Sequence, residues 1–461
     1  MNRQIATEFR TEYSKKLRTP QQAAAEIRDG ERIVTATSSS QPRAFLRSLA
    51  DRTYELKDVQ LVGSFLADDY EFLKEEAHGH IDVLISFLGV KSREYFFRKR
   101  MTDNIEVYSY DFSRTEAVME QLFRPDVFVF ESPLPDEKGN FSFGVIGAMY
   151  GRSAADYVKN HGGRIIVQVN PSVPFVYSGR EEDYINIRDV DIICESDEEI
   201  FPVPLSEPTE TEAAIARHIL PYIHDGATLQ LGFGGIANAI GFSLGDRQHL
   251  GIHTESYVDS MMYLEKQGAV DNSMKNVGKD VSQAAFIMGS RDLYDWADRN
   301  RGIATMPISY ITNPQIIAQI DQFISINSCM NCDLTGQVGS ESIGLRQFSS
   351  QGGQVAFVYG AGLSQGGRSF LCMKSFNRKK DGEMVSTIDM GLPYGTAVTT
   401  PRHEVDCIVT EWGCAELKYK PLNQRAIALI NIAHPDFRKK LYDEALANRI
   451  IAKHQAYRID G

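Results

Sequence analysis

The sequence has few cysteines, no long apolar run and no excess of positive charge. Its six cysteines show no disulfide-framework spacing, which favours a reducing compartment and hence the cytoplasm. No apolar run approaches the roughly 18 residues of a membrane span, and the N-terminal stretch has acids at Glu8 and Glu12 and lacks the apolar centre of a secretory signal. A formal net charge of −12 argues against general binding to nucleic acid or to an anionic membrane. We therefore expect a cytoplasmic protein with a small-molecule partner.

The length of the chain indicates two domains. A chain of 461 residues is too long for one ordinary core, and 43% hydrophobic and 24% charged residues are typical of globular proteins. Residues 202–210, reading PVPLSEPTE, combine three prolines with two acids, a composition that suits a linker. We therefore place an N-terminal domain at residues 1–207 and a C-terminal domain at residues 208–461.

Strand and helix patterns alternate along both halves of the chain. This alternation predicts an α/β fold with a mostly parallel open sheet covered by helices. Because both halves share the same rhythm, we expect two similar domains, as in a duplicated architecture. The predicted strands are residues 32–37, 59–64, 81–88, 105–108, 127–131, 164–169, 192–195, 227–231, 250–253, 282–288, 322–327, 355–359, 370–374 and 407–410.

Residues 229–259 form the stretch around which the rest of the chain is organised. A predicted strand ends in Gly232, Gly234 and Gly235, where a backbone without Cβ atoms lets a ligand approach closely. The helical pattern that follows, residues 236–244, directs its first amides toward these glycines. A second strand then brings Thr254 and Glu255 to the same edge of the sheet, where ligands of parallel sheets bind.

Spacing alone leaves two interpretations of this stretch open. Gly232-x-Gly234-x-x-Ala237 fits a dinucleotide fingerprint, with Glu255 about 20 residues farther on as a ribose-binding acid. That pattern predicts a nicotinamide-dependent dehydrogenase. The same glycines and carboxylate also suit acyl transfer, in which amides stabilise an oxyanion and a carboxylate acts as the nucleophile.

A resemblance that covers the whole chain favours acyl transfer. The segments GFGGIANAIG, LGIHTE, DLTGQVGSESIG, GAGLSQGGRS, VTEWGCAEL and IAHPDF resemble the acetyl-CoA hydrolase/transferase family, which includes butyrate:acetate and 4-hydroxybutyrate CoA-transferases. The resemblance implies the class I CoA-transferase fold. It also implies coenzyme A as a substrate, no tightly bound cofactor, short-chain carboxylates as the other substrates and a homodimeric assembly.

The resemblance also assigns roles to individual residues. It places the nucleophile at Glu255, which would attack the acyl-CoA carbonyl and later carry CoA as a glutamyl thioester. Oxyanion donors are expected from the amides of Gly234 and Gly235 and from the turns at residues 351–354 and 360–362. The residues expected to contact CoA are Gln230, Leu231, Gly232, Phe233, Gly234, Gly235, Met330, Gly353, Gly360 and, as a phosphate contact, Lys380.

Several positions depart from the usual family pattern. Ala237 stands where a proline is common, and residues 256–260 replace a common run after the nucleophile. Tyr359 and Arg368 replace a common arginine and lysine. We expect these departures to adjoin the acyl pocket, so that they affect the choice of substrate and leave the nucleophile unchanged.

Other chemistry-bearing residues have ordinary structural interpretations. Cys329 and Cys332, even with His403 and Cys407, lack the second closely spaced pair of a structural zinc site, and no metal is expected. His253 is expected to pack beside Glu255. Three other activities stay open at this point: an acyl-CoA hydrolase, the dehydrogenase above, and a catalytically silent acyl-CoA sensor.

Overall fold

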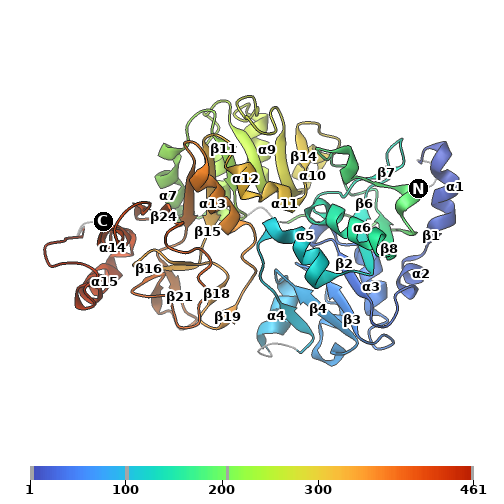
Figure 1. The fold of residues 1–461 in the computed structure, drawn as a ribbon, viewed down its shortest axis with the longest axis horizontal. Helices are drawn as coiled ribbons and strands as arrows, with labels where there is room; N and C mark the ends of the chain where they lie inside the picture. The colour runs from blue at the N-terminus through green and yellow to red at the C-terminus, as the bar shows by residue number, and fades with distance from the viewer. Residues whose placement is uncertain (1–4, 99–102, 204–206, 458–461) are drawn as a thin grey trace. The chain divides into compact units, whose positions relative to one another are not determined.

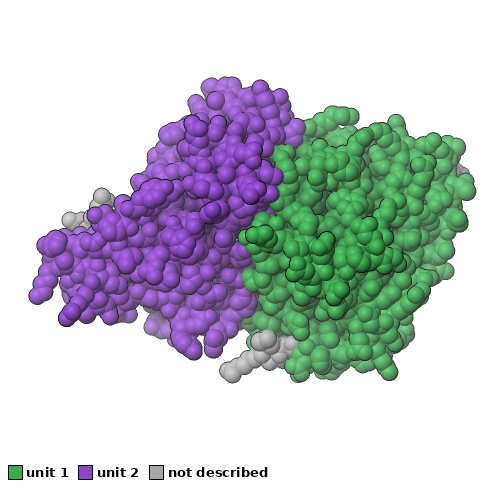
Figure 2. Space-filling view, in the orientation of Figure 1, with its two compact units in different colours: residues 1–204, 283–311 green, residues 205–282, 312–461 purple. Residues whose placement is uncertain are grey.

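The computed structural model describes residues 5–98, 103–203 and 207–457. The chain divides into two compact units, residues 1–204 with 283–311 and residues 205–282 with 312–461 (Figure 2). The predicted domain boundary after residue 207 stays a prediction, and residues 204–206 of the predicted linker lie outside the described residues. Within the described part of the chain, no helix combines the length and the apolar character needed to cross a membrane.

The first unit is built on an eight-stranded sheet in which every pair of neighbouring strands is parallel (Figure 1). Its strand order is β1-β10-β8-β6-β2-β3-β4-β5. The strands are β1 (Leu17–Arg18), β2 (Arg32–Thr35), β3 (Val59–Val62), β4 (Ile81–Ile85), β5 (Ile105–Val107), β6 (Val127–Ser132), β8 (Arg164–Val169) and β10 (Ile192–Glu195).

Helices cover both faces of this sheet because its strands are apolar on both sides. On β6, Val127 and Val129 join the core beneath α2 and α3, whereas Phe128 and Phe130 face the opposite side and stack on each other. Phe143 packs on Phe130 on that opposite side. Buried β-strands of this kind are typical of parallel sheets. The helices of the unit are α1 (Arg10–Lys16), α2 (Pro20–Ala25), α3 (Arg43–Ala50), α4 (Val90–Arg98), α5 (Thr115–Val118), α6 (Gly151–Asn160), α10 (Arg291–Ala297) and α11 (Ile308–Ile311).

Four further strands belong wholly or mostly to the first unit. An antiparallel pair, β7 and β9, joins the proline and glycine loop of residues 133–144 to a later loop. The segment of residues 283–311 belongs to this unit and includes all of β14 and most of β13. The bounds are β7 (Asn140–Phe141), β9 (Ile185–Asn186), β13 (Ser282–Ile287) and β14 (Ile303–Thr305).

The second unit carries a sheet with the strand sequence β12-β11-β15-β20-β24-β25. Among these six described strands, only β25 runs antiparallel to its neighbour. The order from β12 to β24 repeats the order from β3 to β10 of the first unit, which supports the predicted duplication. The strands are β11 (Thr228–Leu231), β12 (Gly251–Tyr257), β15 (Phe323–Ser328), β20 (Arg368–Cys372), β24 (Cys407–Thr410) and β25 (Gly413–Glu416).

Helices and small antiparallel elements surround this second sheet. The two C-terminal helices, α14 and α15, pack on Leu371 and Ile408 in an apolar core that also includes the small sheet β17-β16-β23. The helices are α7 (Glu210–Ile219), α8 (Gly235–Phe242), α9 (Asp259–Lys266), α12 (Pro314–Ile317), α13 (Gln354–Leu363), α14 (Leu422–Ile432) and α15 (Pro435–Ala447). The remaining strands are β16 (Asn331–Asp333), β17 (Val338–Gly339), β18 (Ser342–Ile343), β19 (Arg346–Gln347), β21 (Phe376–Arg378), β22 (Met384–Ser386) and β23 (Ile388–Asp389).

The α/β class and the parallel sheets are confirmed, and one element is wrong. Residues 355–359 form part of helix α13, where a strand was predicted. The segment QVAFVYGAGL is apolar nearly all round, so its short β-branched and aromatic run gives no period that distinguishes a buried helix from a strand. The glycines on either side of this run favoured the strand interpretation. In the structure, the glycines before it form the turn that precedes the helix, and the glycines after it lie within the helix.

Candidate active site

Glu255 lies at the carboxyl edge of the second sheet. β12 pairs with β11 in parallel, with Thr228 opposite Gly251 and Leu229 opposite Ile252. Continuing this register places Thr254 beside Leu231, the last residue of β11, and the Thr254 hydroxyl donates to the Leu231 carbonyl at 3.3 Å. β12 continues to Tyr257, so Glu255 lies within the strand. The predicted strand, residues 250–253, ended before Glu255, and this part of the prediction is wrong.

The carboxylate of Glu255 contacts the start of α13. It accepts a hydrogen bond from the backbone amide of Gly353, the residue that caps this ten-residue helix. A Cβ atom added to Gly353 would collide with Glu255 Oε2 and approach the Thr312 methyl group at 2.8 Å. Glycine at position 353 therefore allows the carboxylate to reach the helix N-terminus, where amides and the helix dipole favour negative charge.

Burial changes the protonation of Glu255. Loss of hydration raises the pKa of this carboxyl to about 7, and the Gly353 amide opposes that rise. His253 and Thr254, its neighbours in the strand, are fully buried, whereas part of Glu255 stays accessible to solvent. The group is thus a poorly hydrated carboxylate that a ligand can reach.

The glycine turn after β11 lies at the same sheet edge. Gly234 has φ = 116°, in the region that favours glycine, and it caps the eight-residue helix α8. A side chain at Gly235 would collide with the carboxylate of Glu212, which caps the start of α7 through Thr209 and pairs with Lys374 at 3.5 Å. Phe233 projects from this turn and is half exposed. The turn therefore exposes one aromatic ring, while the Gly232 amide donates to the Ile326 carbonyl at 2.9 Å.

The residues just before the turn are engaged within the sheet. Gln230 is buried, and its Oε1 accepts from Ser325 Oγ at 2.7 Å and from Asn327 Nδ2 at 3.0 Å. Its Nε2 donates to Asn327 Oδ1 at 3.1 Å. Leu231 is fully buried. The Gln230 side chain thus holds β11 to β15, and the Leu231 side chain lies in the core, so neither side chain is available to a ligand.

The other predicted contact residues occupy different settings. Met330 is partly buried after β15, and its amide donates to the Gly339 carbonyl at 2.9 Å. Lys380 is exposed in the turn between β21 and β22. Gly360 lies inside α13 and packs against Ile317, where any Cβ atom would collide. Its amide belongs to the hydrogen-bonded interior of a helix. Residues 360–362 are therefore helical, and the turn that we expected there at the end of a strand is wrong.

One position that departs from the usual family pattern, Arg368, lies away from the sheet edge that carries Glu255. Arg368 begins β20, opposite Ile324 at the amino end of the sheet. It pairs with Asp406 at 2.7 Å and with Glu416 at 3.4 Å, and it stacks on Tyr222. The expectation that Arg368 adjoins the acyl pocket is wrong, because parallel strands put their first residues at the edge opposite to Glu255.

The other positions that depart from the usual family pattern belong to segments that adjoin the glycine turn or Glu255. Ala237 is buried in the first turn of α8, and Tyr359 is 44% exposed on α13. Ser260 on α9 fits against Gly241 on α8, so residues 256–260 contribute to helix packing. In the described parts of the chain, no three His, Cys, Asp or Glu side chains are grouped so that they could hold a metal ion.

Sequence reasoning missed the groups that support the glycine turns. Thr312 beside Gly353 and Lys374 beside Glu212 lie far from them in the sequence and in no motif. The only available signal for Glu212 was its spacing of three residues from Thr209, which is that of a helix capping box.

Comparison with known proteins agrees with this geometry. Residues 1–205 match the model of the acetyl-CoA hydrolase/transferase N-terminal domain, and residues 289–445 match the model of the C-terminal domain. A 4-hydroxybutyrate coenzyme A transferase of Clostridium kluyveri is 35% identical over 94% of this chain and 97% of its own length. A butyryl-CoA:acetate CoA-transferase of Anaerostipes caccae is 34% identical over 95% and 97%.

Solved structures give the same result. RipA from Yersinia pestis superposes with a TM-score of 0.88 at 30% identity and covers 96% of this chain and 100% of its own. A 4-hydroxybutyrate CoA-transferase from Porphyromonas gingivalis has a TM-score of 0.76 at 29% identity, covering 95% and 100%. The chain therefore belongs to the acetyl-CoA hydrolase/transferase family and is an enzyme of the CoA-transferase type.

Proposed function

We propose that this enzyme moves CoA between a short-chain acyl-CoA and a carboxylate of the acetate or butyrate type, with Glu255 as the nucleophile. The observation that carries the proposal is the partly accessible, poorly hydrated carboxylate of Glu255 at the N-terminus of α13. Full-length relatives named as butyryl-CoA:acetate and 4-hydroxybutyrate CoA-transferases support the choice of substrates.

The reaction follows a ping-pong course. A Glu255 oxygen attacks the thioester carbonyl, the C–S bond breaks, and an acyl-glutamyl anhydride and CoA thiolate form. The thiolate then attacks the glutamyl carbonyl and releases the first carboxylate, which leaves CoA bound to Glu255 as a thioester. A second carboxylate reverses both steps. No net proton transfer is needed, because a carboxylate enters and a carboxylate leaves.

Both attacks pass through tetrahedral oxyanions. The Gly353 amide is the donor closest to the Glu255 carboxyl, and it stabilises the oxyanion that forms when CoA attacks the glutamyl carbonyl. One such donor is typically worth about 3–4 kcal/mol of barrier. The amides of Gly234 and Gly235 serve as donors to the acyl-CoA or to its diphosphate.

The binding surface for CoA comprises the backbone of residues 230–235 with the Phe233 ring, together with Met330, Gly353 and the exposed Lys380. Gly360 shapes this surface only by letting α13 pack against Ile317. A homodimer in the cytoplasm remains the predicted assembly and compartment.

An acyl-CoA hydrolase is the second candidate, and relatives of that name match about half of the chain. The two activities differ in whether water reaches the anhydride and the thioester. Acetyl-CoA or butyryl-CoA should be supplied with and without a second carboxylate, while free thiol and new acyl-CoA are followed. We expect new acyl-CoA only with the acceptor and slow thiol release in both cases. Rapid thiol release that ignores the acceptor would contradict the transferase proposal.

A further inference from the structure

The first unit contains a large basic cavity that the CoA-transfer site does not use. Its volume is about 890 Å³, within the range of small-molecule sites. Five basic side chains line it: Arg10, Lys138, Arg180, Arg299 and Arg301. Asp136, Glu137 and Glu181 also contribute to the lining, so the basic groups outnumber the acidic ones.

One wall of this cavity is held in place by backbone hydrogen bonds. The Arg299 amide donates to the Phe175 carbonyl at 2.9 Å, and the Phe175 amide donates to Asp298 Oδ1 at 2.7 Å. The Thr305 amide donates to the Tyr177 carbonyl, also at 2.9 Å. The turn that carries the two arginines is thereby fixed to the segment that carries the two aromatic rings.

Each of these arginines stacks on one of the rings. The Arg299 guanidinium lies 5.0 Å from the Phe175 ring centre, and the Arg301 guanidinium lies 5.0 Å from the Tyr177 ring centre. The ring centres are 5.8 Å apart. Stacking limits the motion of the guanidinium planes, and both arginines line the cavity, where their N–H groups can donate to a ligand.

The two arginines have no acidic partner among the described residues, whereas the neighbouring cations do. Lys138 pairs with Glu181 at 2.8 Å, and Arg180 makes two hydrogen bonds to Asp183 at 2.7 and 3.0 Å. The charges of Arg299 and Arg301 are therefore available to a ligand in this cavity.

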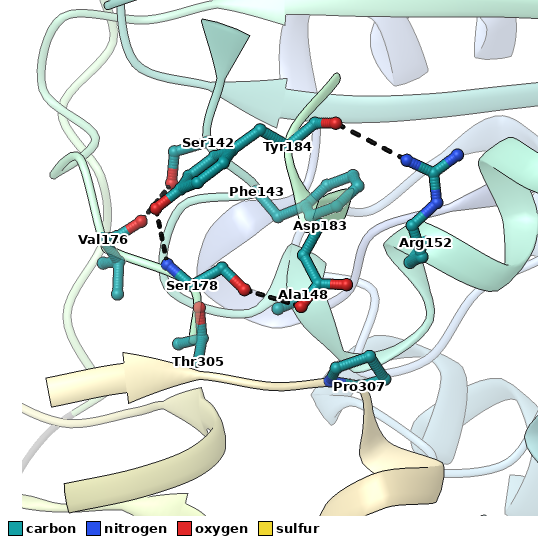
Figure 3. Close-up of a pocket in the computed structure, with 10 residues that line it drawn as sticks. All are labelled: Ser142, Phe143, Ala148, Arg152, Val176, Ser178, Asp183, Tyr184, Thr305 and Pro307. Atoms are coloured by element: carbon teal, nitrogen blue, oxygen red, sulfur yellow. Dashed lines mark hydrogen bonds between the residues drawn. The ribbon is translucent and has the colours of Figure 1, made fainter. Parts of the chain in front are cut away.

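Other residues that line the cavity are held by side-chain hydrogen bonds. Figure 3 shows the Tyr184 hydroxyl directed at the Ser178 amide, which donates to it at 2.7 Å, and the Asp183 carboxylate held by the Ser178 hydroxyl at 2.7 Å. Ser178 and Tyr184 line the large cavity too. Because its walls are already ordered, a ligand would bind with little loss of conformational freedom in the protein.

We propose that this cavity binds a diphosphate or longer polyphosphate group, either free or as part of a nucleotide. Two guanidinium groups held on neighbouring rings match several phosphate oxygens and at least two negative charges. The cavity is also much larger than a single phosphate or acetate ion requires, which favours an extended anion.

Calorimetric titration of the full-length enzyme with pyrophosphate and with ADP tests this proposal. We compare the unchanged enzyme with the Arg299→Gln/Arg301→Gln variant, and use Arg291→Gln as the control because Arg291 is an exposed arginine paired with Asp295. We expect binding of at least one probe, weakened at least about tenfold in the double variant and unchanged in the control. Binding of both probes identifies the diphosphate as the recognised group, and binding of ADP alone identifies a nucleotide.

Two outcomes would overturn the proposal. One is that neither probe binds, and the other is that binding persists in the double variant, which would locate it elsewhere, for example at the glycine turn that we propose for CoA. The Arg301→Lys variant is a control for misfolding, because it keeps the positive charge and loses only the stacked guanidinium group. Its affinity should lie between those of the unchanged enzyme and the double variant. The titration needs no turnover, so its result is independent of whether Glu255 is the nucleophile.

Discussion

The backbone amide of Gly353 donates a hydrogen bond to the carboxylate of Glu255, and the glycine has no side chain that would separate the two. Two segments almost a hundred residues apart thus bring the proposed nucleophile to a helix N-terminus. The same contact explains why a carboxyl with little hydration can still ionise near neutral pH, since the amide stabilises its charged form.

Substituting Gly353 should disable the enzyme without unfolding it. Its φ of −93° suits any residue, so Gly353→Ala introduces no backbone strain, but its Cβ atom would push the Glu255 carboxylate from its position. Displacement of a reacting group by about 1 Å can cost about 100-fold in rate. We expect a loss of that size in kcat, with an unchanged circular dichroism spectrum. Gly391→Ala, at an exposed glycine with open space around it, is the matched control.

The activity should depend on the ionisation of Glu255. Burial raises the pKa of this carboxyl to about 7, and only the carboxylate is a nucleophile, so kcat/KM should fall as the pH drops below about 7. The profile should be measured between pH 5.5 and 8.5 with an acceptor whose own carboxyl stays ionised throughout. A flat profile down to pH 5.5 would show that the nucleophile has an ordinary carboxyl pKa.

A buried lysine should make the stability depend on pH. Lys275 Nζ donates to the carbonyls of Ile252 and Val281 at 2.8 and 2.7 Å, and burial lowers its pKa from 10.5 to about 7. Because the unfolded chain binds the proton more tightly, this group favours folding above pH 10.5, and that contribution is lost as the pH falls toward 7. The total is on the order of 5 kcal/mol for a shift of this size.

Chemical denaturation at several pH values between 7 and 10 measures this effect. Lys275→Met should remove part of the rise in unfolding free energy with pH, whereas Lys279→Met, at an exposed lysine nearby, should retain it. Equal pH dependence in Lys275→Met and the unchanged enzyme would mean that Lys275 titrates as an exposed amine.

Arg368 should affect stability and not the choice of substrate. Arg368→Lys would lose the two-pronged contact with Asp406 and the stacking on Tyr222, at the amino end of the sheet. We expect a decrease of about 1–2 kcal/mol in unfolding free energy and the same relative kcat/KM for acetate and butyrate. A changed acceptor preference would restore the expectation, drawn from the sequence, that this position adjoins the acyl pocket.

The strands were the most predictable part of the fold, because their apolar runs are short and bounded by glycine and polar residues. Residues 164–169, 192–195 and 407–410 form strands with the predicted bounds. Helix α13 was not predictable from pattern, since it is apolar on most sides and includes two glycines. Its correct assignment requires knowing that Gly360 packs against Ile317, a contact between elements that local sequence does not encode.

The candidate site was predictable only where a motif marks it. The glycine turn and Glu255 follow consecutive strand patterns, so parallel pairing alone predicts a common sheet edge. The engagement of Gln230 with Ser325 and Asn327 depends on the register of strands nearly a hundred residues apart, and the placement of Arg368 at the opposite edge depends on the register of β15 and β20. No spacing within the sequence fixes that register.

The most direct test of the central claim is to identify the covalent intermediate. The enzyme should be incubated with acyl-CoA alone, digested and examined by mass spectrometry, with Glu255→Gln as the control. We predict a CoA-sized adduct on the peptide that contains Glu255, sensitive to borohydride or hydroxylamine, and no adduct in the variant. An adduct on another residue, or normal turnover by Glu255→Gln, would contradict the account.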